Sequence, residues 1–293
     1  MLHTIQNKFL TVTAAEKGAE LQSILGADGT EYLWQGDSRY WCDRALNLFP
    51  FVARLTDGKY YLDGELHEMS IHGLAPYRNF TLVENSGQKM ILQLYDDCET
   101  QTQYPRHFSF QVIYQLEENC LNICFRVENR DEKPLYFGLG GHPGFNVPLE
   151  KGKQFEDYRL RFEECAPCKQ VIFTDDCFPT GQTRPFPLED GKILSLNHHL
   201  FDNDAIVLTD MARQVTLESA GAGHSVTVAF PQMPYLGLWH WPKTDAPYLC
   251  IEPWGSLPAK AGEVTVFEEK QDLYCLQPGK IYENTWSIRI QSN

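Results

Sequence analysis

The sequence predicts an all-β fold, in the form of a large antiparallel β-sandwich. Apolar and polar residues alternate over many short segments, which is the period of a half-buried strand. No window of a dozen residues carries a helical i, i+3, i+4, i+7 stripe free of Gly and Pro. Turn signals interrupt the alternation at short intervals, at Asp28-Gly29, Asp57-Gly58, Asp63-Gly64, Asp190-Gly191 and Pro278-Gly279.

Individual strands follow from the same period. In chain order, the pattern predicts strands at residues 10–12, 108–116, 121–127, 135–139, 214–218, 225–230 and 286–290. The second and third form the clearest pair, because only a short polar segment with Glu118 and Asn119 separates them. We therefore expect these two segments to form an antiparallel hairpin.

One domain over residues 1–293 is expected, because all-β domains often reach this size without dividing. Hydrophobic residues make up 43% of the chain and aromatic residues 13%, which supplies a large core and argues against disorder. Residues 151–203 are richer in Pro, Gly, Asp and Glu than their surroundings. We expect a loop-rich excursion there and find no sign of a second domain.

The net charge of −14 argues against nucleic acid and anionic membranes as partners, and no Lys/Arg-rich run offsets it. The N-terminal segment has no pattern of a secretory signal, and no segment reaches the roughly 18 apolar residues of a membrane span. Nine cysteines at scattered positions suit reduced thiols rather than a disulfide framework. These features predict a cytoplasmic protein, either a monomer or a homodimer.

Local catalytic motifs are missing from the sequence. It contains no phosphate-binding P-loop, no G-x-S-x-G elbow, no H-E-x-x-H and no dinucleotide fingerprint. Cys165 and Cys168 have the spacing of a redox or zinc motif, but only Cys177 lies near and a second ligand pair is missing. Two ordinary loop thiols are the favoured interpretation, and any active site must be assembled from distant strands.

His198 and His199 offer another potential metal site, because Asp202 and Asp204 follow closely. Adjacent residues of an extended segment point in opposite directions, however. A metal ion shared by the two histidines is therefore disfavoured.

A carboxylate stands in an otherwise apolar strand at residues 249–255, LCIEPWG. A carboxylate on an apolar face is costly unless it is paired or used in function, so Glu252 is a candidate site residue. Strand alternation divides the segment into two faces, with Leu249 and Ile251 on one and Tyr248, Cys250, Glu252 and Trp254 on the other.

His142 lies in residues 140–145, GGHPGF, directly after the strand predicted at residues 135–139. We expect it in a turn at the end of that strand. On an extended chain it shares a face with Gly138 and Gly140, whose missing side chains would leave room for a ligand to approach the backbone.

His72 precedes a glycine in residues 70–75, SIHGLA. Taken singly, a histidine in the setting of His72 or His142 is more often structural than functional, and Glu252 is the least ordinary of the three. A metal site formed by His72, His142 and Glu252 would suit the ligand types, but it is the less favoured interpretation.

These three stretches, in this order on a β-rich chain, resemble the aldose 1-epimerase (galactose mutarotase-like) family, and in particular its shorter bacterial branch. The resemblance covers nearly the whole chain and implies the family's large β-sandwich, often called a supersandwich. Further matching stretches are Gly18 to Leu21 with Ser23-Ile24, Glu31 to Gln35, Leu48 to Arg54, Asn203 to Ala205 and Pro234 to Trp239.

The resemblance also implies roles for individual residues. Glu252 matches the family's general base and His142 its general acid, while His72 matches the second family histidine. Arg54 matches an arginine that lines the sugar site. Trp239 falls where the family commonly has an aromatic residue, which is suited to packing on the apolar face of a pyranose.

Asp204 matches an aspartate that binds sugar hydroxyls, but Asp202 lies two residues away and stays an alternative. The resemblance implies a hexose as ligand and a reaction that needs no metal, nucleotide or redox cofactor. Related proteins act on hexose 6-phosphates, and a phosphate would require extra cations, for which Arg54, Lys59 and Arg78 are the candidates. The free sugar is the favoured substrate. A non-catalytic carbohydrate-binding or sensing protein is the alternative from another class.

Overall fold

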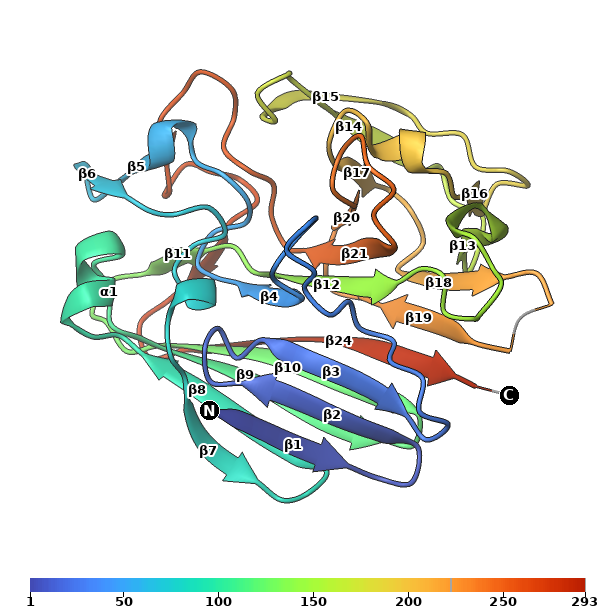
Figure 1. Ribbon diagram of the computed structural model, residues 1–293. Coiled ribbons are helices and arrows are strands. Elements are labelled where there is room, and N and C mark those ends of the chain that lie inside the picture. The colour runs from blue at the N-terminus through green and yellow to red at the C-terminus, as the bar shows by residue number, and fades with distance from the viewer. Residues whose placement is uncertain (222, 293) are drawn as a thin grey trace.

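Two large antiparallel sheets form the body of the computed structural model, which describes residues 1–221 and 223–292 (Figure 1). The first has nine strands in the order β16 (Ile193–Ser195), β13 (Tyr158–Phe162), β18 (Gln214–Ser219), β19 (Ser225–Ala229), β24 (Ile281–Gln291), β10 (Cys120–Asn129), β9 (Phe108–Glu117), β8 (Lys89–Tyr95) and β7 (Thr81–Asn85). The second has seven strands in the order β15 (Pro179–Pro185), β14 (Lys169–Phe173), β17 (Ile206–Thr209), β20 (Tyr235–Trp239), β21 (Tyr248–Trp254), β12 (Gly140–Asn146) and β4 (Ala45–Leu48).

Smaller elements complete the described part of the chain. Three small sheets contain β1 (Leu2–Gln6), β2 (Leu10–Ala15) and β3 (Leu21–Gly26); β22 (Thr265–Val266), β5 (Lys59–Leu62) and β6 (Glu65–Glu68); and β11 (Leu135–Phe137) with β23 (Tyr274–Leu276). The helical segments are α1 (Cys98–Gln103) and the 3₁₀ turns Thr56–Gly58, Ala75–Tyr77, Phe155–Asp157 and His198–Phe201. Among the described residues, no helix is long and apolar enough to cross a membrane.

The all-β prediction is confirmed, and the predicted hairpin is β9 with β10. Glu117 pairs with Cys120, so Glu118 and Asn119 form a two-residue turn. The alternating apolar residues of both strands are buried, as the period of two requires. The predicted strand at residues 135–139 is shorter, because β11 ends at Phe137.

Residues 151–203 differ from the prediction. Instead of a loop-rich excursion, they supply the last two strands at one end of each large sheet, with β16 at the edge beside β13 and β15 at the edge beside β14. The edge strand β15, PTGQTRP, tolerates Pro and a charged residue because one side of its backbone has no partner strand, so its composition resembles that of a loop.

Helix α1 was not predicted from the sequence. It spans only six residues, which is too short to show a helical period. Its start is fixed locally, because the Asp97 side chain accepts hydrogen bonds from the backbone N–H groups of Glu99 and Thr100.

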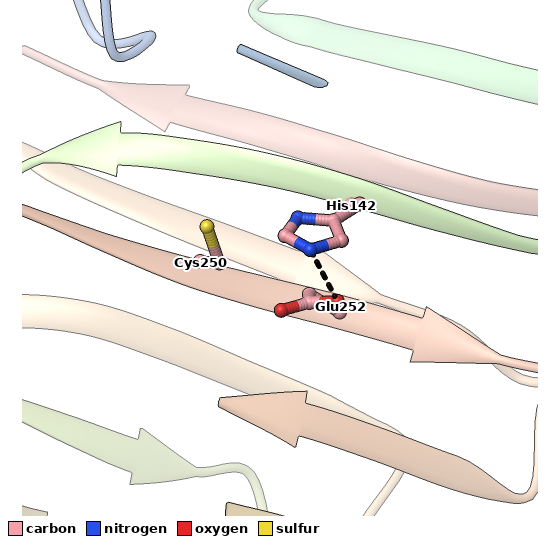
Figure 2. Close-up of side chains that lie close together, drawn as sticks. All are labelled: His142, Cys250 and Glu252. Atoms are coloured by element: carbon pink, nitrogen blue, oxygen red, sulfur yellow. Dashed lines mark ion pairs between the residues drawn. The ribbon is translucent and has the colours of Figure 1, made fainter. Parts of the chain in front are cut away.

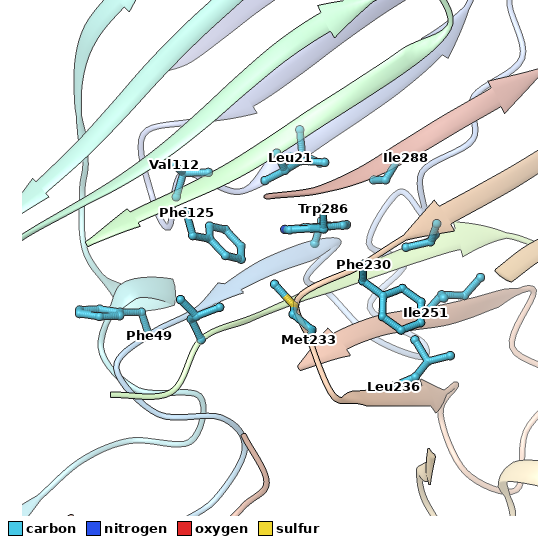
Figure 3. Packing of buried hydrophobic residues seen from close by; sticks show 14 of the residues in the cluster. Leu21, Phe49, Val112, Phe125, Phe230, Met233, Leu236, Ile251, Trp286 and Ile288 are labelled. Atoms are coloured by element: carbon cyan, nitrogen blue, oxygen red, sulfur yellow. The ribbon is translucent and has the colours of Figure 1, made fainter. Parts of the chain in front are cut away.

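The main hydrophobic core lies between the two large sheets (Figure 3). Phe125 and Trp286 enter it from the nine-stranded sheet, and Leu236 and Ile251 from the seven-stranded sheet. The sheets approach closely at Gly141 of β12, where an added Cβ would lie 2.5 Å from the Trp286 ring. One face of the seven-stranded sheet is thus committed to the core, and its opposite face is left for a site.

Candidate active site

Strand register brings two of the candidate residues together on the outer face of the seven-stranded sheet. β12 and β21 are antiparallel, and the pairing of Gly140 with Trp254 places His142 directly opposite Glu252. The imidazole Nε2 lies 3.2 Å from the carboxylate Oε2 (Figure 2). The pair is almost fully buried, with 8% of His142 and 1% of Glu252 exposed.

His142 therefore lies inside a central strand, and the expectation of a turn at the end of a strand is wrong. Proline follows each member of the pair, as Pro143 and Pro253, and neither has an amide hydrogen to donate to the sheet. Glycine and proline in this segment indicated a turn, whereas tertiary pairing with β4 and β21 extends it.

The predicted division of β21 into two faces is confirmed. Leu249 and Ile251 belong to the main core, whereas Cys250 packs in a separate aromatic cluster with Trp34, Trp41 and Tyr248 on the other face. Glu252 thus stands on the outer face, as the alternation indicated.

The expectation that Gly138 and Gly140 leave space for a ligand is wrong. An added Cβ at Gly140 would lie 3.0 Å from the Trp254 ring, and at Gly138 the hydroxyl of Ser256 occupies the space. These glycines make room for the protein's own side chains. Neither glycine lines the cavity above the His142–Glu252 pair.

A cavity of about 520 Å³ opens above the His142–Glu252 pair. Its size falls within the range of ordinary small-molecule sites. Six of the seven predicted site residues line it, although they come from segments far apart in the sequence. They are Arg54, His72, His142, Asp204, Trp239 and Glu252.

Arg78 is the predicted site residue that lies elsewhere. Its guanidinium forms an ion pair with Glu99 at the start of α1, and it does not line the cavity. Lys59 likewise pairs with Glu68, at 3.9 Å. Among the described residues, Arg54 is the one Lys or Arg side chain that lines the cavity, so the predicted cluster of cations does not form there.

Electrostatics of the pair are dominated by burial. Burial raises the pKa of the Glu252 carboxyl well above its usual range, against a weaker opposing effect of the Trp254 indole. Burial also lowers the pKa of His142 well below its usual value, and neighbouring His72 adds to this effect. Both shifts disfavour charge, so burial favours the neutral carboxyl and the neutral imidazole in this pair.

His72 is held in one tautomer. Its Nδ1 accepts a hydrogen bond from the backbone N–H of Ala53 at 3.2 Å, so the proton of the neutral ring is on Nε2. Burial, assisted by the charge of Arg54, lowers the pKa of His72 to about 4. His72 is therefore a neutral hydrogen-bond donor at the cavity wall, and its ring is T-shaped to that of His142 with centroids 5.4 Å apart.

Four cavity residues other than glycine have left-handed backbone conformations, which is unusual. The φ angles are 56° at Ala53, 65° at His72, 61° at Cys177 and 74° at Asp204. Such a conformation costs about 1–2 kcal/mol per residue and persists only where the surrounding structure enforces it. The backbones of Ala53 and His72 are fixed to each other, because His72 N–H donates to Ala53 O at 2.8 Å.

Asp204 reaches the cavity wall beside a cysteine that the sequence did not indicate. The thiol of Cys177 donates to Asp204 Oδ2 at 2.9 Å, and burial together with this carboxylate raises the pKa of Cys177 to about 11. Asp202 does not line the cavity, because its carboxylate lies 3.0 Å from Nδ1 of His199. Geometry therefore favours Asp204 over Asp202 as the aspartate of the site.

Aromatic rings form much of the cavity wall. Trp41 lies 4.8 Å from the His142 ring, and Trp239 lies 5.8 Å from it. Trp41 was missed because it lies in an irregular segment between β3 and β4, where no period indicates which way a side chain points. Flat apolar walls with a few polar groups are typical of sugar-binding sites.

The metal motifs considered from the sequence do not assemble in the described part of the chain. Cys165 is exposed and donates to a backbone carbonyl, and His198 contacts His240 rather than sharing a ligand with His199. One group of potential metal ligands does form, from His142, Cys250 and Glu252 (Figure 2). It includes Cys250 in place of the expected His72.

Comparisons with known proteins show the family and the fold. The family model described as aldose 1-epimerase matches residues 1–288. Protein LacX, encoded on a plasmid of Lactococcus lactis subsp. lactis, is 33% identical over 294 residues, covering 98% of each chain.

Two solved structures are similar over nearly their full length. The galactose mutarotase related enzyme from Lactobacillus acidophilus shares 30% identity with a TM-score of 0.94, over 100% of this chain and 98% of that one. The galactose mutarotase-like protein from Lactobacillus casei shares 31% identity with a TM-score of 0.94, over 99% of this chain and 100% of that one. The chain belongs to the aldose 1-epimerase family, a family of carbohydrate epimerases.

Proposed function

We propose that this protein is an aldose 1-epimerase that interconverts the α and β anomers of a hexose by acid–base ring opening. The observation that carries the proposal is the buried His142–Glu252 pair, with Nε2 and Oε2 3.2 Å apart at the base of a cavity with aromatic walls. A buried acid–base pair that opens onto a cavity is a common feature of catalytic sites.

In the proposed reaction, the Glu252 carboxylate takes the proton of the anomeric hydroxyl while the His142 imidazolium protonates the ring oxygen. The C1–O5 bond breaks, and C1 becomes the carbonyl carbon of the open-chain aldehyde. After rotation about C1–C2, O5 attacks the other face of C1, His142 recovers its proton and Glu252 returns one to O1. Each positioned group contributes about 10²–10⁴-fold.

Proton count supports these roles. The reactive form, a carboxylate beside an imidazolium, carries the same single proton as the neutral pair of the empty cavity. The two forms differ only in which of the two groups holds that proton. Binding of the two sugar oxygens therefore requires no proton exchange with solvent.

The remaining cavity residues are proposed to hold the sugar. His72 Nε2–H is available as a donor, while Asp204 and Arg54 offer an acceptor and a cationic donor to hydroxyl groups. Trp239 packs on an apolar sugar face.

We favour a free hexose over a hexose 6-phosphate, because Arg54 is joined at the cavity by the two acidic residues Asp43 and Asp204. A phosphate would face more negative than positive side chains. We further propose a cytoplasmic monomer or homodimer without nucleic acid or membrane partners, consistent with the net charge of −14.

The test is polarimetry of freshly dissolved α-glucose and α-galactose, with the 6-phosphates followed by NMR. Glu252→Gln and His142→Asn should each lower the accelerated rate about 10²–10⁴-fold without unfolding the protein. The exposed substitutions Glu263→Gln and His199→Asn are matched controls that should keep the wild-type rate.

Full activity in Glu252→Gln or His142→Asn would rule out the proposed roles. Sugar binding without any acceleration by the wild-type protein would favour the alternative, a non-catalytic carbohydrate-binding protein. Selective acceleration of the 6-phosphates would identify a phosphosugar epimerase.

A further inference from the structure

Three side chains with different metal-binding atoms converge below the cavity. Cys250 and Glu252 lie two residues apart on the outer face of β21, and His142 faces them from β12 (Figure 2). The His142 ring nitrogens, the Cys250 sulfur and the Glu252 carboxylate offer ligand atoms that all lie within 4.8 Å of one another. All three residues are buried.

A carboxylate oxygen in this group is left without a hydrogen-bond partner. Oε2 of Glu252 has only the contact with His142 Nε2, which lacks hydrogen-bond geometry, among the described residues. Buried polar atoms without partners are costly, and a bound ion is one of the ways proteins satisfy them.

We propose that His142, Cys250 and Glu252 form a binding site for a thiophilic divalent cation, with Zn²⁺ as the best-matched ion. Zinc takes nitrogen, sulfur and carboxylate ligands in tetrahedral geometry, and three protein ligands leave the fourth position open. Metal–ligand lengths of about 2.0–2.3 Å place tetrahedral ligand atoms about 3.3–3.7 Å apart. The Nε2–Oε2 separation of 3.2 Å is close to that value, so the sulfur is the ligand that moves inward.

Charge balance favours a dication at this position. On binding, Zn²⁺ displaces the proton of the Cys250 thiol and the proton held by the His142–Glu252 pair, and both protons leave to solvent. The thiolate and the carboxylate then supply two negative charges and the neutral imidazole none, so the complex with Zn²⁺ is neutral, as a buried site requires. Hard ions such as Mg²⁺ prefer six oxygen ligands, which the described residues around this position do not provide. Selectivity for Zn²⁺, Cd²⁺ and Co²⁺ over Mg²⁺ follows.

The cavity gives an ion a path to the site. His142 and Glu252 line the cavity, whereas Cys250 lies behind them, packed with Trp41 in the aromatic cluster. A bound ion would occupy both groups that the proposed function assigns as acid and base. Zn²⁺ should therefore inhibit anomer interconversion; this consequence rests on the proposed function, but binding of the ion does not.

Co²⁺ absorption tests the site without any activity measurement. Tetrahedral Co²⁺ with a thiolate ligand gives visible d–d bands and a near-ultraviolet sulfur-to-metal charge-transfer band. The wild-type protein should show both bands at one equivalent, and Zn²⁺ should displace the cobalt while Mg²⁺ does not. Cys250→Ser should lose the charge-transfer band. Its affinity for Zn²⁺ should fall by more than about 100-fold, because loss of a mere outer-shell partner already costs roughly 10–100-fold.

Cys177→Ser is the matched control. Like Cys250, Cys177 is a thiol close to a carboxylate, but it lines the cavity and lies outside the proposed metal site. This variant should keep the charge-transfer band. A thermal melt of each variant shows whether it is folded. If serine destabilises the buried position, Cys250→Ala is the second variant, and it should also lack the charge-transfer band.

Loss of the band in Cys177→Ser but not in the Cys250 variants would overturn the proposal, as would a wild-type protein without a charge-transfer band. A cobalt band in a protein that does not accelerate mutarotation would refute the proposed function and leave the metal site standing.

Discussion

At the residue scale, the site is defined by groups whose ordinary charge has been suppressed. His72 is fixed as a neutral donor by the N–H of Ala53, and burial favours the neutral forms of His142 and Glu252. Neutral groups can form hydrogen bonds with an uncharged sugar without first giving up a hydration shell. The pH–rate profile should therefore lack the step near pH 6.5 that an ordinary histidine would give.

Asp204 and Asp202 give a matched pair of substitutions. Asp204→Asn should lower kcat/KM about 10–100-fold through a higher KM, because a hydrogen bond from a sugar hydroxyl to a carboxylate contributes about 1.5–3 kcal/mol. Asp202→Asn should change little, since it removes only a surface contact with exposed His199. Steady-state polarimetry compares them, and equal losses would contradict the assignment of Asp204.

At the element scale, the seven-stranded sheet assigns different tasks to its two faces. In β12, Gly141 faces Trp286 in the core while His142 faces the cavity. In β20, Gly237 pairs with Glu252 and leaves space for the Trp254 ring above it. A side chain at Gly141 would collide with the core face of the sheet, and a side chain at Gly237 with residues on its outer face.

Alanine at these two glycines should separate stability from activity. Gly141→Ala should lower the free energy of unfolding by about 1–3 kcal/mol through overpacking against Trp286. In Gly237→Ala, the new Cβ would lie 3.0 Å from the Trp254 ring and 3.3 Å from Cβ of Glu252, so catalysis should suffer more than stability. Urea unfolding and polarimetry on both variants provide the check. A Gly237→Ala enzyme with wild-type kcat/KM would show that Glu252 does not depend on this spacing.

At the scale of the whole molecule, buried histidines link folding to pH. His240 is fully buried, donates from Nδ1 to the Trp241 carbonyl and contacts His198 through Nε2. Burial lowers its pKa to about 4. The unfolded chain takes up this proton near pH 6.5 but the folded chain only near pH 4, so stability falls as the pH drops through this interval.

His240→Gln should reduce that pH dependence. Each such histidine contributes a slope of at most about 1.4 kcal/mol per pH unit between its two pKa values. Urea unfolding at pH 7, 6 and 5 should therefore show a flatter slope in the variant, whatever its stability at pH 7. Substitution of exposed His199 by Gln is the control, and an unchanged slope in His240→Gln would argue against a neutral buried His240.

The sequence by itself determined the all-β fold and the two faces of β21, because side chains alternate wherever one side of a strand is buried. Residue pattern singled out His72, His142 and Glu252 as candidates, and resemblance to the family gave them roles and added Arg54, Asp204 and Trp239. That one domain spans residues 1–293 stays a prediction.

Features that depend on strand register and side-chain packing were decided only by the tertiary structure. It extended GGHPGF into a central strand, because pairing energy from two neighbours outweighs a local turn preference. It placed Arg78 beside Glu99, filled the space at Gly138 and Gly140, and brought Trp41 and Cys250 to the His142–Glu252 pair. These contacts join residues far apart in sequence, and no local period encodes which distant strands become neighbours.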